Sequence, residues 1–172
     1  MKWVLKAANI VDEEVDVLVC SANVSLNLSG GVGAELLGRY GLHMQQVLHA
    51  LLKSRSPHCV ERGEIIPYTS PSIPYKAILH AVAVNGWYES SSAIITTLVR
   101  SCLSKAQSYS ARKIALTALA TGYGNLSLED FARGIRPIMS EQFPPIEEAR
   151  VCLLEDYRVR ELAEHLPGAI VK

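Results

Sequence analysis

The expected fold follows from residues 8–33, which read ANIVDEEVDVLVCSANVSLNLSGGVG. The apolar run Val15–Cys20 predicts a buried strand, which ends in the small polar residues Ser21–Asn23. A glycine-rich turn, Gly30–Gly33, then opens a predicted helix. Unpaired N–H groups at a helix N-terminus need partners, and the helix dipole favours negative charge there. The stretch therefore predicts an anion or phosphate site beyond the carboxyl end of a strand.

A second glycine-rich turn, Thr121–Gly124, follows another apolar run, Lys113–Leu119. In open α/β sheets ligands bind past the carboxyl ends of the strands, so two such turns can converge on one diphosphate. Neither turn matches the Walker A sequence or the Gly-x-Gly-x-x-Gly fingerprint. A tight turn without any ligand role is the plainer interpretation of either turn taken alone.

Apolar periodicities that suit strands and helices alternate along the rest of the chain. We expect residues 1–172 to form a single three-layer α/β/α domain with a mixed, mostly parallel sheet. Gly41 is expected to separate two helices, and Ser127 with Asp130 to cap another. Further expected elements are an edge strand Lys2–Lys6, a short edge strand Glu64–Thr69, a central strand Lys76–Val84, a helix Glu89–Ser108, a last strand Arg150–Leu154 and a closing helix Asp156–Leu166.

Composition narrows the class of protein. Lysine plus arginine equals aspartate plus glutamate, 17 each, so no broad field favours nucleic acid or a membrane surface. The 4 cysteines form no CxxC pair, and no histidine stands at zinc spacing, so we expect no metal and a reducing, cytoplasmic compartment. We expect neither a secretion signal nor a membrane span. The sequence predicts no oligomeric state.

Several single residues invite a chemical role but also have a plain structural interpretation. His80 lies in an apolar run and is expected to be a core histidine, with the other histidines at the surface. Cys20 at a strand end could be a nucleophile, but no neighbouring base is visible, so a small buried filler is preferred. The acidic run Asp12–Glu14 is expected to be a solvated turn.

Motifs along nearly the whole chain resemble those of the macrodomain family, which binds ADP-ribose and processes ADP-ribose 1″-phosphate. Residues 15–23, VDVLVCSAN, align without a gap with the family pattern Val-Asp-x-Ile-Val-Asn-Ala-Ala-Asn. Ala8–Ile10 takes the place of the family's Gly-Asp-Ile, and Gly30–Val32 of its first phosphate loop. Ala77–Val82 resembles the Val-Ile-His-x-Val strand, and Ala118–Gly124 the second phosphate loop.

The resemblance implies a role for each matching position. Asn9 would accept from the adenine amine beside Ile10, Asn23 would bond the distal ribose, and Tyr123 would cover that ribose. The two turns would wrap the diphosphate with main-chain N–H groups, and no cofactor or metal is implied. The implied ligand set is Asn9, Ile10, Ala22, Asn23, Gly30, Gly31, Val32, Gly33, Thr121, Gly122, Tyr123, Gly124, Asn125 and Leu154.

The chain also departs from the family pattern at positions that would touch the ligand. Asn9 stands in place of an aspartate, and Cys20 in place of the first asparagine of its motif. Gly33 occupies the position where the subfamily that hydrolyses mono-ADP-ribose from proteins has an aspartate. Leu154 falls near the expected adenine-stacking aromatic, with Tyr157 three residues further on.

Three functions are therefore compatible with the sequence. The first is a binding module for ADP-ribose or a mono-ADP-ribosylated protein. The second is a hydrolase acting on an ADP-ribosyl ester or on ADP-ribose 1″-phosphate, in which Asn23 would be the catalytic residue. The third is a diverged relative that binds another nucleotide or a protein partner.

Overall fold

A computed structural model describes all residues from Met1 to Lys172. Its centre is a seven-stranded sheet in the order β3-β4-β2-β5-β6-β1-β7. All pairings are parallel except that of β3 with β4, so the expected mixed, mostly parallel sheet is confirmed. The strands are β1 (Lys2–Ala7), β2 (Val17–Ala22), β3 (Ile65–Tyr68), β4 (Ala77–Val82), β5 (Lys113–Thr117), β6 (Glu148–Leu153) and β7 (Ile170–Val171).

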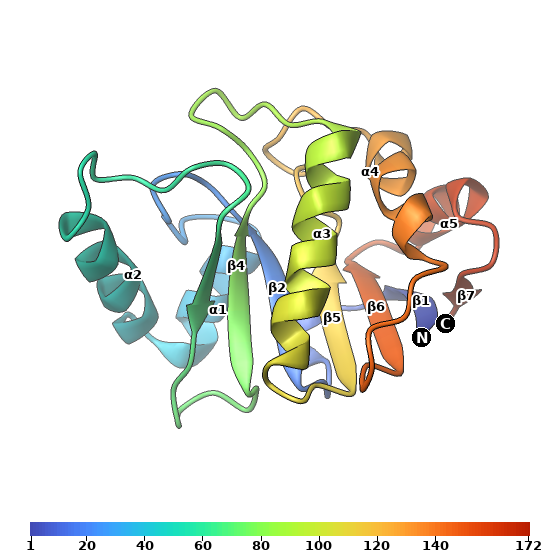
Figure 1. Ribbon diagram of the computed structural model, residues 1–172, viewed down its shortest axis with the longest axis horizontal. Helices are drawn as coiled ribbons and strands as arrows, with labels where there is room; N and C mark the ends of the chain where they lie inside the picture. The colour runs from blue at the N-terminus through green and yellow to red at the C-terminus, as the bar shows by residue number, and fades with distance from the viewer.

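Helices cover both faces of this sheet, with α3 in front of it and α1 behind it (Figure 1). Val17 and Val19 pack on one face in a core shared with α3, α4 and α5, whereas Leu18 and Cys20 face α1 and α2. This alternation follows from the period of two in a strand and explains why β2 is apolar throughout. The helices are α1 (Val32–Tyr40), α2 (His43–Lys53), α3 (Ser92–Gln107), α4 (Leu128–Ile135) and α5 (Asp156–His165).

The expected helix boundaries are largely confirmed. Gly41 ends α1 with a φ of 78°, a conformation that suits glycine. Ser127 and Asp130 form a reciprocal capping box at the start of α4. A Cβ on Gly134 would lie 2.7 Å from Cβ of Ile95, so this glycine lets α4 approach α3 closely.

Two expectations about the sheet are wrong at its right-hand side in Figure 1. β6 is not the last strand, because the chain returns after α5 and forms β7. β7 pairs with β1 in parallel, and the N–H of Lys172 donates to the carbonyl of Leu5 at 3.0 Å. β1 is therefore not an edge strand. At the other side, β3 is an edge strand as expected, which accommodates Pro67 because proline has no N–H to donate.

The acidic run before β2 is not uniformly solvated, contrary to expectation. Glu13 is 5% exposed, and its carboxylate bonds Lys6 at 2.7 Å and Arg150 at 2.8 Å. Asp12 pairs with Arg39, and only Glu14 is exposed without an ion pair. Glu13 thus joins the segment before β2 to β6 and β1, which are the second and third strands from β2 in the sheet.

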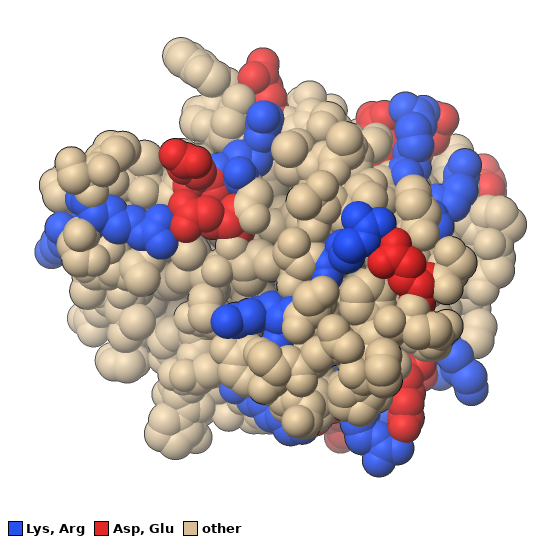
Figure 2. Space-filling model, viewed as in Figure 1, with Lys and Arg blue, Asp and Glu red and all other residues tan.

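Charged side chains of both signs are interspersed on the face seen in Figure 2, with no extended area of one sign. Many of them form ion pairs, such as Arg55 with Glu64 and Arg100 with Glu141. No helix is both long enough and apolar enough to cross a membrane.

Candidate functional site

A cavity of about 430 Å³ lies beyond the carboxyl ends of β2, β5 and β6. In Figure 1 the segments that follow these strands gather at the upper edge of the sheet. The volume of the cavity lies within the range of small-molecule sites. The lining residues include Ser21, Ala22, Asn23, Gly30, Gly31, Val32, Gly33, Tyr88, Thr121, Gly122, Tyr123, Gly124, Leu154 and Arg158.

The first glycine-rich turn presents free main-chain donors to this cavity. The N–H groups of Gly30, Gly31 and Val32 donate to no other group of the protein. Gly31 has a φ of 51° and a ψ of −135°, which only glycine adopts without strain. A Cβ on Gly33 would lie 2.9 Å from Cα of Leu28, so the start of α1 approaches the preceding backbone too closely for a side chain.

The second turn repeats this arrangement. The N–H groups of Gly122, Tyr123 and Gly124 also lack a partner in the protein. Ala120, just before the turn, has a φ of 62°, and a Cβ on Gly124 would meet its carbonyl oxygen at 2.4 Å. The turn is therefore tightly folded, and it leaves three successive donors available to a ligand.

The two turns meet, because each follows the carboxyl end of a strand and the structure pairs these two strands, β2 and β5, in parallel. A Cβ on Gly30 would lie 2.5 Å from the hydroxyl oxygen of Tyr123, so the tyrosine ring lies against the first turn. Tyr123 remains 76% exposed. A ligand in the cavity can therefore contact main-chain donors of both turns and one face or edge of this ring.

Asn23 lines the cavity but also holds the loop that leads to the first turn. Its Oδ1 accepts from the N–H of Ser25 at 3.0 Å and of Asn27 at 3.2 Å, and its Nδ2 donates to the carbonyl of Asn27. Asparagine commonly fills such a turn role, because its side chain can bond main-chain groups a few residues further along the chain. The second hydrogen of Nδ2 is left for a ligand.

The loop between β4 and α3 adds a wall that the sequence did not predict. Tyr88 lines the cavity and has a φ of 61°, an uncommon conformation for a tyrosine. Asn125 does not line the cavity but ties this wall to the second turn: its N–H donates to the carbonyl of Tyr88, and its Oδ1 accepts from Ser90 at 2.8 Å. The Asn85-Gly86 turn signal was the only hint of this loop.

The other end of the cavity is formed by the end of β6 and the first turn of α5. Cys152, Leu153 and Leu154 lie there, and Leu154 is 68% exposed. Tyr157 does not line the cavity, whereas Arg158 does, and no sequence motif had singled it out. Burial, and secondarily the carboxylate of Glu13, raises the pKa of Cys152 to about 12, so its thiol is uncharged at neutral pH.

Besides Asn125, two residues of the implied ligand set, Asn9 and Ile10, lie outside the cavity lining. Asn9 caps the short helical turn Ile10–Asp12 with its Oδ1, which accepts from Val11 at 3.3 Å. Its Nδ2 donates to Glu35 in α1 at 3.1 Å. Ile10 is buried in the core beneath. The amide of Asn9 is therefore engaged within the protein.

Cys20 and His80 form a buried pair across β2 and β4. Cys20 Sγ lies 3.3 Å from His80 Nδ1, and both side chains are almost inaccessible. Burial raises the pKa of the thiol to about 12 and lowers the pKa of the imidazole to about 4. Both groups are thus neutral near pH 7, and neither lines the cavity. His80 is a core residue as expected, although its Nε2 has no partner.

The buried imidazole predicts a pH-dependent stability. Because its pKa is about 4 when folded and about 6.5 when exposed, the unfolded chain binds more protons between these values. The free energy of unfolding should fall by about 2 kcal/mol from pH 7 to pH 5. Urea unfolding at each pH measures this loss, which should vanish in His80→Asn and persist in the exposed-site control His58→Asn. An equal loss in His80→Asn would contradict the assignment.

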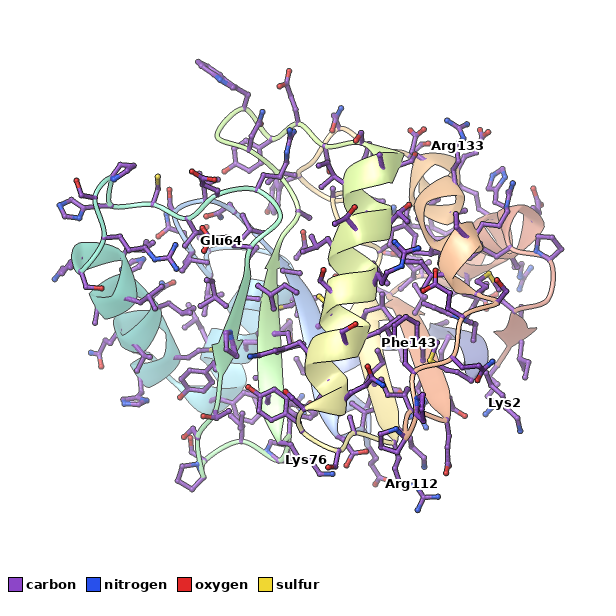
Figure 3. All side chains as sticks on the ribbon, viewed as in Figure 1. Lys2, Glu64, Lys76, Arg112, Arg133 and Phe143 are labelled. Atoms are coloured by element: carbon purple, nitrogen blue, oxygen red, sulfur yellow. The ribbon has the colours of Figure 1, made fainter.

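A second, more open cleft of about 1000 Å³ lies at the amino ends of the strands. Figure 3 labels Arg112, which lines this cleft, and Lys76, which also lies at the lower edge of the sheet. Most of its charges are already paired, as in Arg112–Glu147 at 2.5 Å and Lys76–Asp16 at 3.0 Å. No cluster of metal-ligating side chains occurs anywhere in the chain. The cavity with the free N–H groups is therefore the better site for an anionic ligand.

The comparisons with known proteins agree with this geometry. Residues 19–135 match the family model described as Macro domain. A macro domain-containing protein of Streptomyces griseus is 30% identical over 164 residues, with 94% of this chain and 93% of that protein covered. The Oceanobacillus iheyensis macrodomain with ADP superposes with a TM-score of 0.81 at 19% identity, covering 92% of this chain and 86% of the other. The Trypanosoma brucei macrodomain in complex with ADP-ribose gives 0.77 at 18% identity, covering 94% and 68%.

Proposed function

The chain belongs to the macrodomain family, and from that premise we propose that its cavity binds ADP-ribose, either free or attached to a protein. The observation that carries the proposal is the pair of turns whose successive N–H groups, in Gly30–Val32 and Gly122–Gly124, have no partner in the protein. Both line one cavity and touch through Tyr123. Main-chain donors of this kind suit a diphosphate because they need no counter-charge from side chains.

The placement of the turns orients the ligand. The diphosphate would lie between the two runs of N–H groups, and the distal ribose would lie toward Asn23 and Tyr123. The adenosine would then lie at the end of β6, beside Leu154. Sheet strands are about 4.8 Å apart, so the step from β2 across β5 to β6 spans about 10 Å. That length suits an extended dinucleotide-like ligand.

Binding is favoured over hydrolysis by the side chains in the cavity. The thiol of Cys152 is held neutral, and the buried Cys20–His80 pair has no access. An aspartate cannot replace Gly33 without moving Leu28, so the loop carboxylate of the hydrolysing subfamily has no room here. Hydrolysis through a bound water held by Asn23 and the turns is the alternative to be tested.

Titration calorimetry with ADP-ribose, ADP and AMP tests the binding proposal. We expect ADP-ribose to bind about tenfold more tightly than ADP, because only ADP-ribose reaches Asn23 and Tyr123 with a ribose, and a few polar contacts are worth about 1.4 kcal/mol. AMP should bind most weakly, since it lacks one phosphate. The proposal fails if none of the three binds. Equal affinities for ADP-ribose and ADP would remove the distal-ribose assignment alone.

A second experiment, an activity assay, distinguishes a binding protein from a hydrolase. The protein is incubated with a mono-ADP-ribosylated protein and with ADP-ribose 1″-phosphate, and released ADP-ribose is measured. We expect no release above that of a buffer blank. Release that disappears in Asn23→Ala would establish the hydrolase alternative.

A further inference from the structure

One arginine of the cavity has no partner in the protein. The guanidinium of every other arginine donates to a carboxylate or a main-chain carbonyl, as in Arg39–Asp12 or Arg136 with the carbonyl of His165. Arg158 forms no side-chain hydrogen bond and no ion pair, although it is partly buried and lines the cavity. A partly buried, unpaired guanidinium is the kind of group for which a bound ligand supplies the missing interaction partner.

The helix that carries Arg158 does not stabilise its charge. Arg158 is the third residue of α5, so the positive end of the helix dipole opposes it. Glu155 stands three positions earlier and lines the same cavity but makes no ion pair with it. Asp156 pairs with Arg160 instead. Neither the local helix nor its carboxylates therefore account for a cation at this position.

The surroundings of Arg158 suit a flat, apolar group better than a phosphate. Cys152, Leu153 and Leu154 form this end of the cavity. The free N–H groups that suit phosphates belong to the two turns after β2 and β5. The N–H groups of Leu154–Tyr157 after β6 also lack a partner in the protein, but the carboxylate of Glu155 lines this end of the cavity and disfavours a phosphate there. Asn9 is engaged with Val11 and Glu35. A guanidinium plane stacks well on an aromatic ring, which an ammonium group does not.

We propose that Arg158 covers the base of the bound nucleotide, with its guanidinium stacked on the ring above Leu154. This rests on the proposed function, because it assigns the base to the end of β6. Arg158 then takes the place of the aromatic side chain that Tyr157 does not supply. Since every base has a π-face, such stacking contributes affinity without selecting the base. The site should therefore accept ADP and GDP with affinities within about fivefold of each other.

Variants of Arg158 test the proposal by calorimetry with ADP-ribose and by competition with inorganic pyrophosphate. Arg158→Ala should weaken ADP-ribose about tenfold, Arg158→Lys should recover little of this, and Arg158→Phe should bind within about threefold of wild type. Pyrophosphate, which has no base, should compete equally well against all of them. Arg160→Ala, on the same helix, is the matched control and should leave every affinity unchanged.

The possible failures are distinguishable. If wild type binds no ADP-ribose, the proposed function fails. If wild type binds and Arg158→Ala binds equally well, only the role of Arg158 is refuted. A full recovery by Arg158→Lys, a parallel loss of pyrophosphate affinity, or tighter wild-type binding of ADP-ribose 2′-phosphate would show that Arg158 binds a phosphate and would overturn the stacking proposal.

Discussion

Gly122→Glu is expected to weaken ADP-ribose binding by about 100-fold or more while leaving the free energy of unfolding unchanged. Gly122 lines the cavity within the run of free N–H groups of the second turn. A carboxylate about 5 Å from a phosphate costs about 3 kcal/mol at an effective dielectric constant of 20, which is slightly more than 100-fold in affinity. Titration calorimetry measures the affinity, and urea unfolding measures the stability.

Gly122 allows a cleaner experiment than the other glycines of the two turns. A Cβ there meets no atom within 4 Å, and the backbone does not have a positive φ. Gly122→Ala is therefore the matched control and should bind ADP-ribose within about threefold of wild type. Gly31→Glu would mix charge with backbone strain, because Gly31 has a φ of 51°. Wild-type affinity in Gly122→Glu would show that the diphosphate does not lie on the second turn.

The turns could be predicted from the sequence because local rules determine them. A glycine run after an apolar strand and before a helix has few alternatives, and parallel strands bring their carboxyl ends to one edge. The joining contact between Tyr123 and Gly30 follows from that topology. Tyr88 and Arg158 could not be predicted in this way. Tyr88 is held at the cavity by the bond from the N–H of Asn125 to its carbonyl. Arg158 reaches the cavity because α5 packs against β1 and α4, and neither this packing nor the bond from Asn125 is local in sequence.

In the sheet, too, the elements that could be predicted depend on neighbouring residues, and those that could not depend on contacts far apart in the sequence. The buried strands and the capping box of α4 follow from apolar runs and from Ser127 and Asp130. The terminal strand β7 could not be predicted from the sequence, because it has only two residues, Ile170 and Val171, which follow closely on a proline and a glycine. Their pairing depends on β1, more than 160 residues away in sequence. Asn9 is a further case, since its bond to Glu35 needs α1 in place.

Glu13→Ala is expected to lower the free energy of unfolding by about 3 kcal/mol. Its carboxylate is buried and bonds both Lys6 and Arg150, and Arg150 is itself only 15% exposed. Removing one partner of a buried ion pair leaves uncompensated charge in a region of low polarity, which typically costs 3–5 kcal/mol. Arg150 retains Glu148, so the lower end of that range applies. Urea unfolding at neutral pH gives the value.

Glu14→Ala is the matched control, because the two glutamates are adjacent and identical in type. Glu14 is exposed and has no ion pair, so its loss should change stability by less than about 0.5 kcal/mol. Glu13→Gln keeps the shape but removes the charge, and it should lose nearly as much as Glu13→Ala if the charge is the cause. Equal stability of Glu13→Ala and Glu14→Ala would mean that the Lys6–Glu13–Arg150 contacts contribute nothing to holding the segment before β2 against β1 and β6.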